Sequence, residues 1–204
     1  TVKLLNGYNV SYPLEMIDAI TEIGDSIHTT SETSPIEQNQ DLPKVTIIHT
    51  GGKIASKVDY ATGAVIARFE PEELLASVPD ILDIAIIDAV KLGNMWSDDI
   101  RSQHWNKMID ACTNAFESGS VGVVITHGTD TLHISASALS FAFAGNGQKP
   151  AGRIVFTGSQ RSSDRASSDA TENLISAVYW AANGPEVNGN GDAAVTIMHA
   201  GSGD

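Results

Sequence analysis

Cysteine, cationic side chains and long apolar runs are all scarce in this chain of 204 residues. Cys112 is the single cysteine, so an internal disulfide is excluded, which fits a reducing cytoplasm. Runs such as Val121 to Thr126 and Ala193 to Met198 are far too short to cross a bilayer. The sequence does not open with a basic and then apolar leader, so we expect no secretory signal. These absences favour a cytoplasmic protein without a membrane anchor.

Positive charge is the second shortage. The chain has 12 lysine and arginine residues against 25 aspartate and glutamate residues, a formal net charge of −13. Nucleic-acid binding draws most of its affinity from cationic contacts to phosphates. The chain is therefore a poor nucleic-acid binder by itself, and any contact with RNA has to pass through a partner. Ordinary apolar content and modest charged content predict a folded domain rather than a disordered one.

The sequence divides into segments of different character. Residues 1–28 hold two apolar runs around Asn6-Gly7, a pair that favours a tight hairpin, followed by a short helical pattern. A hairpin and one helix are too little to fold alone, so we interpret this segment as the end of a small β domain. Residues 29–43 are polar and lack periodicity, which predicts a linker before the main domain at residues 44–204.

From Lys44 onward, apolar runs of strand length alternate with helical patterns. We expect strands at Val45–Ile48, Ile84–Val90, Val121–Ile125, Ile154–Phe156 and Ala193–Met198. We expect helices at Pro71–Val78, Asp98–Glu117, Thr131–Phe143 and Ser167–Ala182. Continuous apolar strands separated by helices predict an α/β fold, in which a parallel sheet carries helices on both faces.

Residues capable of chemistry follow four of these strands. In parallel sheets, ligands bind in the crevice at the carboxyl ends of the strands. The groups that follow the strands are Thr50-Gly51-Gly52-Lys53, Ser97-Asp98, Thr126-His127-Gly128-Thr129-Asp130-Thr131 and Thr157 to Asp164. We expect these four strand ends to meet at one pocket, with the Thr50 hydroxyl exposed inside it.

The turn after Thr50 has three possible roles. Paired glycines, Gly51 and Gly52, let the backbone approach a substrate closely, and their N–H groups can stabilise an oxyanion. Thr50 is then a candidate nucleophile that needs a base to remove its proton. The structural alternative is a plain strand-to-helix turn with a capping hydroxyl. A phosphate-binding loop is disfavoured, because the full Gly-x4-Gly-Lys-Ser/Thr pattern is absent.

The other groups also have a structural and a functional interpretation. Thr129 and Asp130 either cap the following helix or form a catalytic hydroxyl and carboxylate pair. Ser97 and Asp98 either begin a long helix, which spacing alone favours, or bind the α-groups of an amino acid. His127 is one of six histidines, but none has a partner at metal-ligand spacing, so we expect no metal site.

Two further features are interpreted structurally. The cluster of alternating charge between Arg161 and Asp169 is most simply a salt-bridged loop and helix start. The three tryptophans, Trp96, Trp105 and Trp180, are interpreted as core or interface residues rather than platforms for stacking bases.

These motifs in series resemble the bacterial-type asparaginase/glutaminase family, from about Lys44 to the end of the chain. The likeness rests on Thr50-Gly51-Gly52-x-Ile54-Ala55, then Tyr60-x-x-Gly63-x-Val65, then Ser97, then His127-Gly128-Thr129-Asp130-Thr131. Within the family, the loop from Ala55 to Val65 and the segment from Gln160 to Asp169 are most similar to the D-type subunits of archaeal glutamyl-tRNA(Gln) amidotransferases. In that branch, a small β domain precedes the amidohydrolase domain. The segment Leu5-Asn6-Gly7-Tyr8-Asn9 resembles the end of this small domain.

The resemblance implies a glutaminase that supplies ammonia to a partner, the E-type subunit of the amidotransferase. The partner binds the tRNA and uses ATP and Mg to activate its misacylated glutamate, and the ammonia then completes glutaminyl-tRNA. Glutamine or asparagine is the implied substrate, tRNA is bound only through the partner, and the glutaminase needs no cofactor and forms a homodimer. Two alternatives stay open: a free-standing L-asparaginase, and a non-catalytic amino-acid-binding domain.

The resemblance also implies roles for individual residues. Thr50 attacks the side-chain amide and forms an acyl-enzyme, with Tyr60 on a mobile loop assisting it. A second hydroxyl and carboxylate pair works with a lysine, and a further set binds the substrate. The implied catalytic residues are Thr50, Tyr60, Thr129 and Asp130. The implied substrate-binding residues are Ser97, Asp98, Gly51 and Gly128.

Two features depart from the family pattern. The family usually has threonine where this chain has Lys53. The family's catalytic lysine lies beyond the last strand, shortly after the position of Asp204, and the second, smaller C-terminal domain is absent from this sequence. We therefore expect this polypeptide to be a fragment that is inactive by itself.

Overall fold

The computed structural model describes residues 2–3, 9–10, 13–19, 38–58, 65–67, 78–144, 147–163, 168–189 and 191–200. The chain forms two compact units, residues 1–37 and 38–204. In the first unit, β1 (Val2–Lys3) pairs antiparallel with β2 (Asn9–Val10), which agrees with the hairpin expected around Asn6-Gly7. A short 3-10 helix, η1 (Leu14–Met16), follows this pair.

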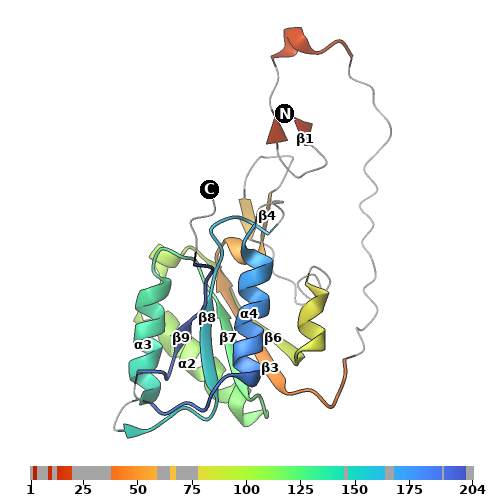
Figure 1. Cartoon of the computed structure of the whole chain (residues 1–204). Helices are drawn as coiled ribbons and strands as arrows, with labels where there is room; N and C mark the ends of the chain where they lie inside the picture. The colour runs from red at the N-terminus through yellow and green to blue at the C-terminus, as the bar shows by residue number, and fades with distance from the viewer. Residues whose placement is uncertain are drawn as a thin grey trace. The chain divides into compact units, whose positions relative to one another are not determined.

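A parallel sheet of five strands forms the centre of the second unit, in the order β6-β3-β7-β8-β9 (Figure 1). The strands are β3 (Lys44–Gly51), β6 (Ile86–Met95), β7 (Gly122–Thr126), β8 (Arg153–Thr157) and β9 (Val195–Thr196). The predicted α/β fold with a parallel sheet is confirmed.

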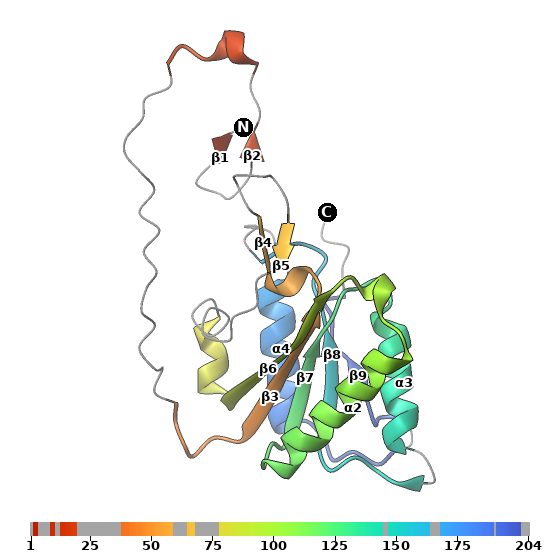
Figure 2. The same ribbon diagram turned by 180° about the vertical axis from the view of Figure 1, so that it is seen from behind.

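Helices cover both faces of this sheet. On one face lie α2 (Ser102–Glu117) and α3 (Leu132–Ala144), which stand in front of the strands in Figure 2. On the other face lie α4 (Ala170–Asn183) and the 3-10 helix η3 (Pro79–Asp83). Each face has its own buried apolar cluster, so the sheet is enclosed on both sides as its apolar strands predict.

Strand β8 shows why these strands consist of apolar residues without interruption. Successive side chains of a strand point to opposite faces of the sheet. Ile154 and Phe156 belong to the cluster under α2 and α3, whereas Val155 belongs to the cluster under α4. All three are at most 1% exposed, so each of these three positions needs an apolar residue.

Strand β6 is longer than the sequence predicts. The apolar run ends at Val90, but the parallel pairing of β6 with β3 continues until Gly51 lies opposite Met95. Gly93 and Asn94 therefore belong to the strand instead of the loop after it. Because β6 is an edge strand of the sheet, many of its residues are only partly buried or exposed, and its end cannot be read from an apolar run.

The long helix expected at Asp98–Glu117 is two elements. A 3-10 helix, η4 (Ser97–Asp99), is separated from α2 by the extended residues Ile100 and Arg101. Arg101 is the N-cap of α2, and its main-chain N–H donates to His104 Nδ1 at 2.9 Å. The interpretation of Ser97 and Asp98 as the start of the long helix is therefore wrong.

Three smaller elements complete the second unit. The 3-10 helix η2 (Lys53–Ala55) follows β3 and leads into β4 (Ser56–Val58), which pairs antiparallel with β5 (Val65–Ala67). The helix expected at Pro71–Val78 lies outside the described residues except for Val78. Within the described part of the chain, no helix has the length and apolar character needed to span a membrane.

Gly122 tests the packing of α4 on the sheet. A Cβ at this position would overlap the main-chain carbonyl oxygen of Ala181 in α4, so Gly122→Ala has to push the helix away from β7. We expect it to lower the free energy of unfolding by about 1–3 kcal/mol, measured by urea denaturation. The matched control is Gly93→Ala in β6, whose Cβ would meet only the Met95 side chain at 3.5 Å. Equal midpoints for the two variants would contradict this account.

Candidate functional site at the strand ends

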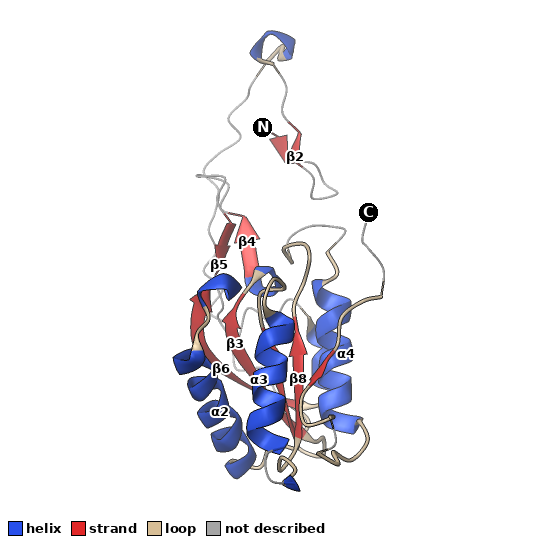
Figure 3. Ribbon diagram, turned by 90° about the vertical axis from the view of Figure 1, so that its left-hand side faces the viewer, coloured by secondary structure: helices blue, strands red, loops and turns tan. Residues whose placement is uncertain are grey.

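The ends of β3, β6 and β7 touch through main-chain atoms. Gly51 and Gly52 have positive φ angles of 141° and 89°, which a residue with a side chain rarely adopts. A Cβ on Gly51 would overlap the carbonyl oxygen of Met95, and a Cβ on Gly52 would lie 2.8 Å from the main-chain N of Gly128. Both glycines are therefore required for the close approach of these strand ends, which lie at one edge of the sheet (Figure 3).

Two further contacts join η4 and β8 to the same edge. A Cβ on Gly128 would lie 2.9 Å from Oγ of Ser97, and Thr131 Oγ1 donates to the Ser97 carbonyl at 2.7 Å. A Cβ on Gly158, after β8, would lie 3.1 Å from the Thr129 methyl group. The four strand ends therefore lie next to one another, and the pocket expected between them stays a prediction.

Thr50 is buried at the end of β3. Its side chain is 0% exposed, and its hydroxyl donates to the carbonyl of Thr126 in β7 at 2.9 Å. The expected exposure of this hydroxyl is therefore wrong. The physical reason is that β3 still pairs with β6 at Gly51, so residue 50 lies inside the sheet and not beyond its end. A catalytic role for Thr50 stays a prediction, and it requires the side chain to leave this bond.

His49 forms a polar layer beneath the strand ends. Its Nε2 lies 3.1 Å from the acceptor Asn94 Oδ1, and its Nδ1 lies 2.7 Å from Thr126 Oγ1. Nε2 therefore carries the proton, and Nδ1 accepts from the Thr126 hydroxyl. Burial lowers the pKa of His49 to about 4, although the bond to Asn94 acts in the opposite direction. The ring is neutral near pH 7 and joins β6, β3 and β7.

His127 forms a second network that holds the β7 loop. Its Nδ1 donates to the Gly128 carbonyl at 2.7 Å, so its Nε2 accepts from the Ser135 hydroxyl at 2.8 Å. Ser135 Oγ in turn accepts from Trp105 Nε1 at 3.0 Å. Burial lowers the pKa of His127 below its ordinary value. This fully bonded imidazole orients the main chain directly before Thr129.

The other predicted site residues vary in accessibility. Thr129 is partly exposed, and within the described part of the chain its hydroxyl makes no hydrogen bond, while Asp130 and Asp98 are exposed. Ser97 is 4% exposed, and its Oγ has no hydrogen-bond partner among the described residues. Tyr60 lies outside the described residues. Among the residues that are described, no group of His, Cys, Asp or Glu could hold a metal ion.

Asp169 anchors the loop after β8. Its carboxylate accepts from the main-chain N–H groups of Gln160 at 3.0 Å and Arg161 at 3.2 Å, and from Asn173 Nδ2 at 2.8 Å. Its Oδ2 also lies 3.1 Å from Nδ1 of His199. Burial acts to raise the pKa of Asp169, but the hydrogen bonds from main-chain N–H groups, together with His199, outweigh it, so the pKa lies below its ordinary value.

Asn173 connects this loop to β9. Its Nδ2 donates to the Gly158 carbonyl at 2.9 Å, and its Oδ1 accepts from the main-chain N–H of His199 at 2.8 Å. The alternating charges from Arg161 to Asp169 predict a salt-bridged loop. The salt bridges stay a prediction, because Asp164 and Arg165 lie outside the described residues. The described contacts of Asp169 are mostly hydrogen bonds to N–H groups, which hold the loop in place.

Lys53 is the first exposed residue beyond the end of β3. Its ammonium donates to the Gln160 carbonyl in the loop after β8 at 3.4 Å. Ser159, beside Gln160, is 2% exposed, and its Oγ has no hydrogen-bond partner among the described residues. The side chain that extends from the end of β3 toward the β8 loop is therefore at position 53, and not at position 50.

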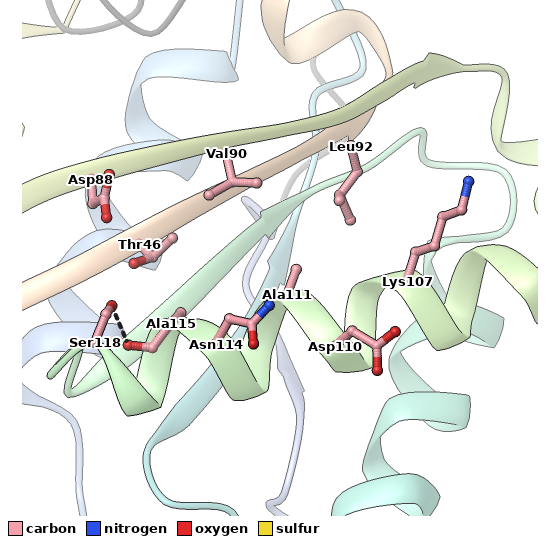
Figure 4. A pocket seen from close by; sticks show the side chains of 10 residues that line it. All are labelled: Thr46, Asp88, Val90, Leu92, Lys107, Asp110, Ala111, Asn114, Ala115 and Ser118. Carbon is pink, nitrogen blue, oxygen red and sulfur yellow. Dashed lines mark hydrogen bonds between the residues drawn. The ribbon is translucent and has the colours of Figure 1, made fainter.

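A hollow of about 410 Å³ lies away from this edge, between β6 and α2 (Figure 4). It is lined by residues from β3, β6 and α2 and the turn that follows α2: Thr46, Asp88, Val90, Leu92, Lys107, Asp110, Ala111, Asn114, Ala115 and Ser118. None of the predicted site residues lines it. The hollow lies along the outer strand of the sheet and is separate from the strand-end site.

The architecture is that of an α/β domain whose candidate ligand site is the carboxyl edge of its parallel sheet. The N-terminal domain of the asparaginase family, described as "Asparaginase, N-terminal", matches residues 44–200. The chain belongs to this family.

Relatives agree with this assignment. The chain is 42% identical over 210 residues to the D-type subunit of glutamyl-tRNA(Gln) amidotransferase from Pyrococcus furiosus, and 43% identical over 212 residues to the one from Thermococcus kodakarensis. Both matches take in 100% of this chain but 44% of the relative, so the chain spans less than half the length of these relatives.

Two solved structures share the fold. A probable cytoplasmic L-asparaginase from Campylobacter jejuni is 28% identical, with a TM-score of 0.63 over 76% of this chain and 45% of that one. The thermostable L-asparaginase from Thermococcus kodakarensis is 32% identical, with a TM-score of 0.57 over 69% of this chain and 41% of that one.

Because the pKa values of His49 and His127 are lowered in the folded protein, we expect the free energy of unfolding to fall in acid. A group whose folded pKa is lowered takes up its proton more readily when unfolded, so its stabilisation is complete above about pH 6.5 and is lost as the pH falls toward 4. From His49 alone we expect a loss of roughly 3 kcal/mol. Urea unfolding between pH 7 and pH 4 measures it. His49→Gln should reduce the slope, whereas a change at exposed His133 should not, and an unchanged slope in His49→Gln would contradict the assignment.

We expect the loop after β8 to depend on Asp169 for its stability. Asp169→Ala leaves the N–H groups of Gln160 and Arg161 without their acceptor, so we expect the free energy of unfolding to fall by about 1–3 kcal/mol. The control is Glu172→Ala, which removes an exposed carboxylate from the first turn of the same helix. Hydrogen exchange of the Gln160 and Arg161 amides should speed up only in Asp169→Ala. Equal protection in both variants would show that the carboxylate does not hold this loop.

Proposed function

We propose that this chain provides the amino-acid-binding site of a glutaminase subunit in a tRNA-dependent amidotransferase. The glutaminase hydrolyses glutamine and supplies the ammonia with which its partner, the E-type subunit, converts glutamyl-tRNA(Gln) to glutaminyl-tRNA(Gln). The observation that carries the proposal is the likeness of the whole chain, not only of residues 44–200, to the D-type subunits of archaeal amidotransferases.

The strand-end geometry supports a binding site for a small polar molecule. Ser97 and Ser159 each hold a buried hydroxyl without a partner among the described residues. An unsatisfied buried polar group costs about 1–3 kcal/mol, so such groups are typical of places where a ligand or an ordered water binds. In the proposal, Ser97 and Asp98 bind the α-groups of the amino acid, beside the main chain of Gly51 and Gly128.

The attacking group in the proposal is a threonine hydroxyl that forms an acyl-enzyme. Thr50 is held by its bond to Thr126 and would have to rotate out of the sheet before it could attack. Thr129 is partly exposed, follows the rigid His127 network and has a carboxylate, Asp130, as its neighbour. We therefore propose Thr129 as the first hydroxyl to test as the attacking group. Tyr60 would assist the reaction from its loop.

Charge and composition support a division of labour between the two partners. A formal net charge of −13 disfavours direct contact with the tRNA phosphates, so the proposal assigns RNA binding, ATP and Mg to the E-type subunit. The glutaminase would then need no cofactor, and it would act in the cytoplasm, where tRNA is charged. We propose a homodimer of the glutaminase as its oligomeric state.

A free-standing L-asparaginase is the second candidate, because the two solved structures described above carry that name. The two functions differ in their response to RNA. A glutaminase subunit releases more ammonia from glutamine when its tRNA-binding partner and glutamyl-tRNA(Gln) are present, whereas a free asparaginase does not respond. Co-purification of the gene product with a tRNA-binding protein supports the first candidate, and activity on asparagine alone supports the second.

Ammonia release by the full-length gene product tests which hydroxyl acts. We expect Thr129→Ala to lower kcat at least about a hundredfold, and Thr50→Val, which keeps the shape of the side chain, to lower it far less. Lys53→Thr should raise kcat, because it restores the hydroxyl that the family usually presents at the exposed end of β3. Full activity of Thr129→Ala would refute Thr129 as the attacking group. A large loss of kcat in Thr50→Val would instead identify Thr50 as the attacking group.

A further inference from the structure

We infer that Lys53 makes this site bind an acidic amino acid, glutamate or aspartate, more tightly than the corresponding amide. The inference rests on the proposed function, because it concerns the same strand-end site. It follows from two observations: the hydroxyl of Thr50 is turned into the sheet, and the exposed position that follows the glycines carries an ammonium group.

The charge of Lys53 is not neutralised by any residue that the structure describes. Within those residues, its Nζ has one polar contact, the neutral carbonyl oxygen of Gln160 at 3.4 Å. That distance is long for a charged donor, so the contact leaves most of the capacity of the ammonium unused. An ammonium carries three donors, and a carboxylate is its preferred partner.

The carboxylate that holds the adjoining loop is already committed. Asp169 accepts from the N–H groups of Gln160 and Arg161 and from Asn173, and it lies beside His199. These contacts fix the carboxylate under the loop, where it binds N–H donors. Asp169 is therefore not available to pair with Lys53.

The hydroxyl of Ser159 supplies a second, independent observation. It follows Gly158 in the loop whose Gln160 carbonyl meets Lys53, it is 2% exposed, and its Oγ has no partner among the described residues. A serine hydroxyl without a partner can donate to an acceptor oxygen, and a carboxylate offers two such oxygens. Lys53 and Ser159 therefore place a cation after β3 and a hydroxyl donor after β8, in two segments that the bond from Lys53 to Gln160 joins.

The two ligand forms differ in what they offer to an ammonium group. The acid presents two anionic oxygens, whereas the amide presents one neutral oxygen and two N–H donors that an ammonium disfavours. Because Lys53 is exposed, solvent screens the attraction, and we expect a preference of roughly fivefold for the acid at low salt. Hydrolysis of the amide releases ammonia and leaves the acid, so the acid product would compete with the substrate for the site.

The test is calorimetric titration of the full-length gene product with L-glutamate and L-glutamine, and then with L-aspartate and L-asparagine. The quantity to compare is the ratio of the two dissociation constants in each pair. Lys53→Met removes the charge and Lys53→Arg retains it. The matched control is Lys107→Met, which removes an exposed ammonium from α2, beside the hollow of Figure 4.

We expect the wild-type protein, Lys53→Arg and Lys107→Met to bind the acid about fivefold more tightly, and Lys53→Met to lose that preference. Raising the salt concentration should reduce the preference only where residue 53 is charged. An unchanged ratio in Lys53→Met overturns the inference and leaves the proposed function standing. Failure of all four amino acids to bind the wild-type protein overturns the proposed function as well.

Discussion

The contact of bare main chain at the ends of β3, β6 and β7 is the constraint on which the site depends. Gly51 lies against the carbonyl of Met95, and Gly52 lies against Gly128, with no room for a Cβ at either contact. Residues with side chains at these two positions would force the strand ends apart. Every other group of the site is placed relative to this contact.

Two hydrogen-bonded networks, each centred on a neutral histidine, hold the segments that make this contact. His49 is bonded between Asn94 and Thr126, and His127 is bonded between the Gly128 carbonyl and Ser135. Because both imidazoles are buried and their pKa values are lowered, they are uncharged near neutral pH and connect the neighbouring segments through hydrogen bonds. These hydrogen-bonded networks keep the loop residues in fixed positions, which a site for a small ligand requires.

Position 53 carries a lysine where the resemblance expects a threonine, and the ligand preference that we infer depends on this residue. The resemblance expects a hydroxyl there, and the structure shows that Thr50 cannot replace it without leaving its bond to Thr126. A lysine that reaches the loop after β8 changes the electrostatics of a site that otherwise keeps its glycines and its β7 loop. In our inference, this charge makes the site favour an acidic ligand over the amide.

The sequence by itself determined the α/β class, the five strands of the sheet, though not all of their bounds, and the set of loops that meet. Apolar runs and glycine pairs are local signals, and parallel strands necessarily end at one edge of a sheet. Only the tertiary structure decided that Thr50 is buried, that β6 continues to Met95, and that Asp169 and Asn173 hold the β8 loop. Those outcomes depend on pairing and hydrogen bonds between residues far apart in the chain, such as Gly51 with Met95, which no local pattern records.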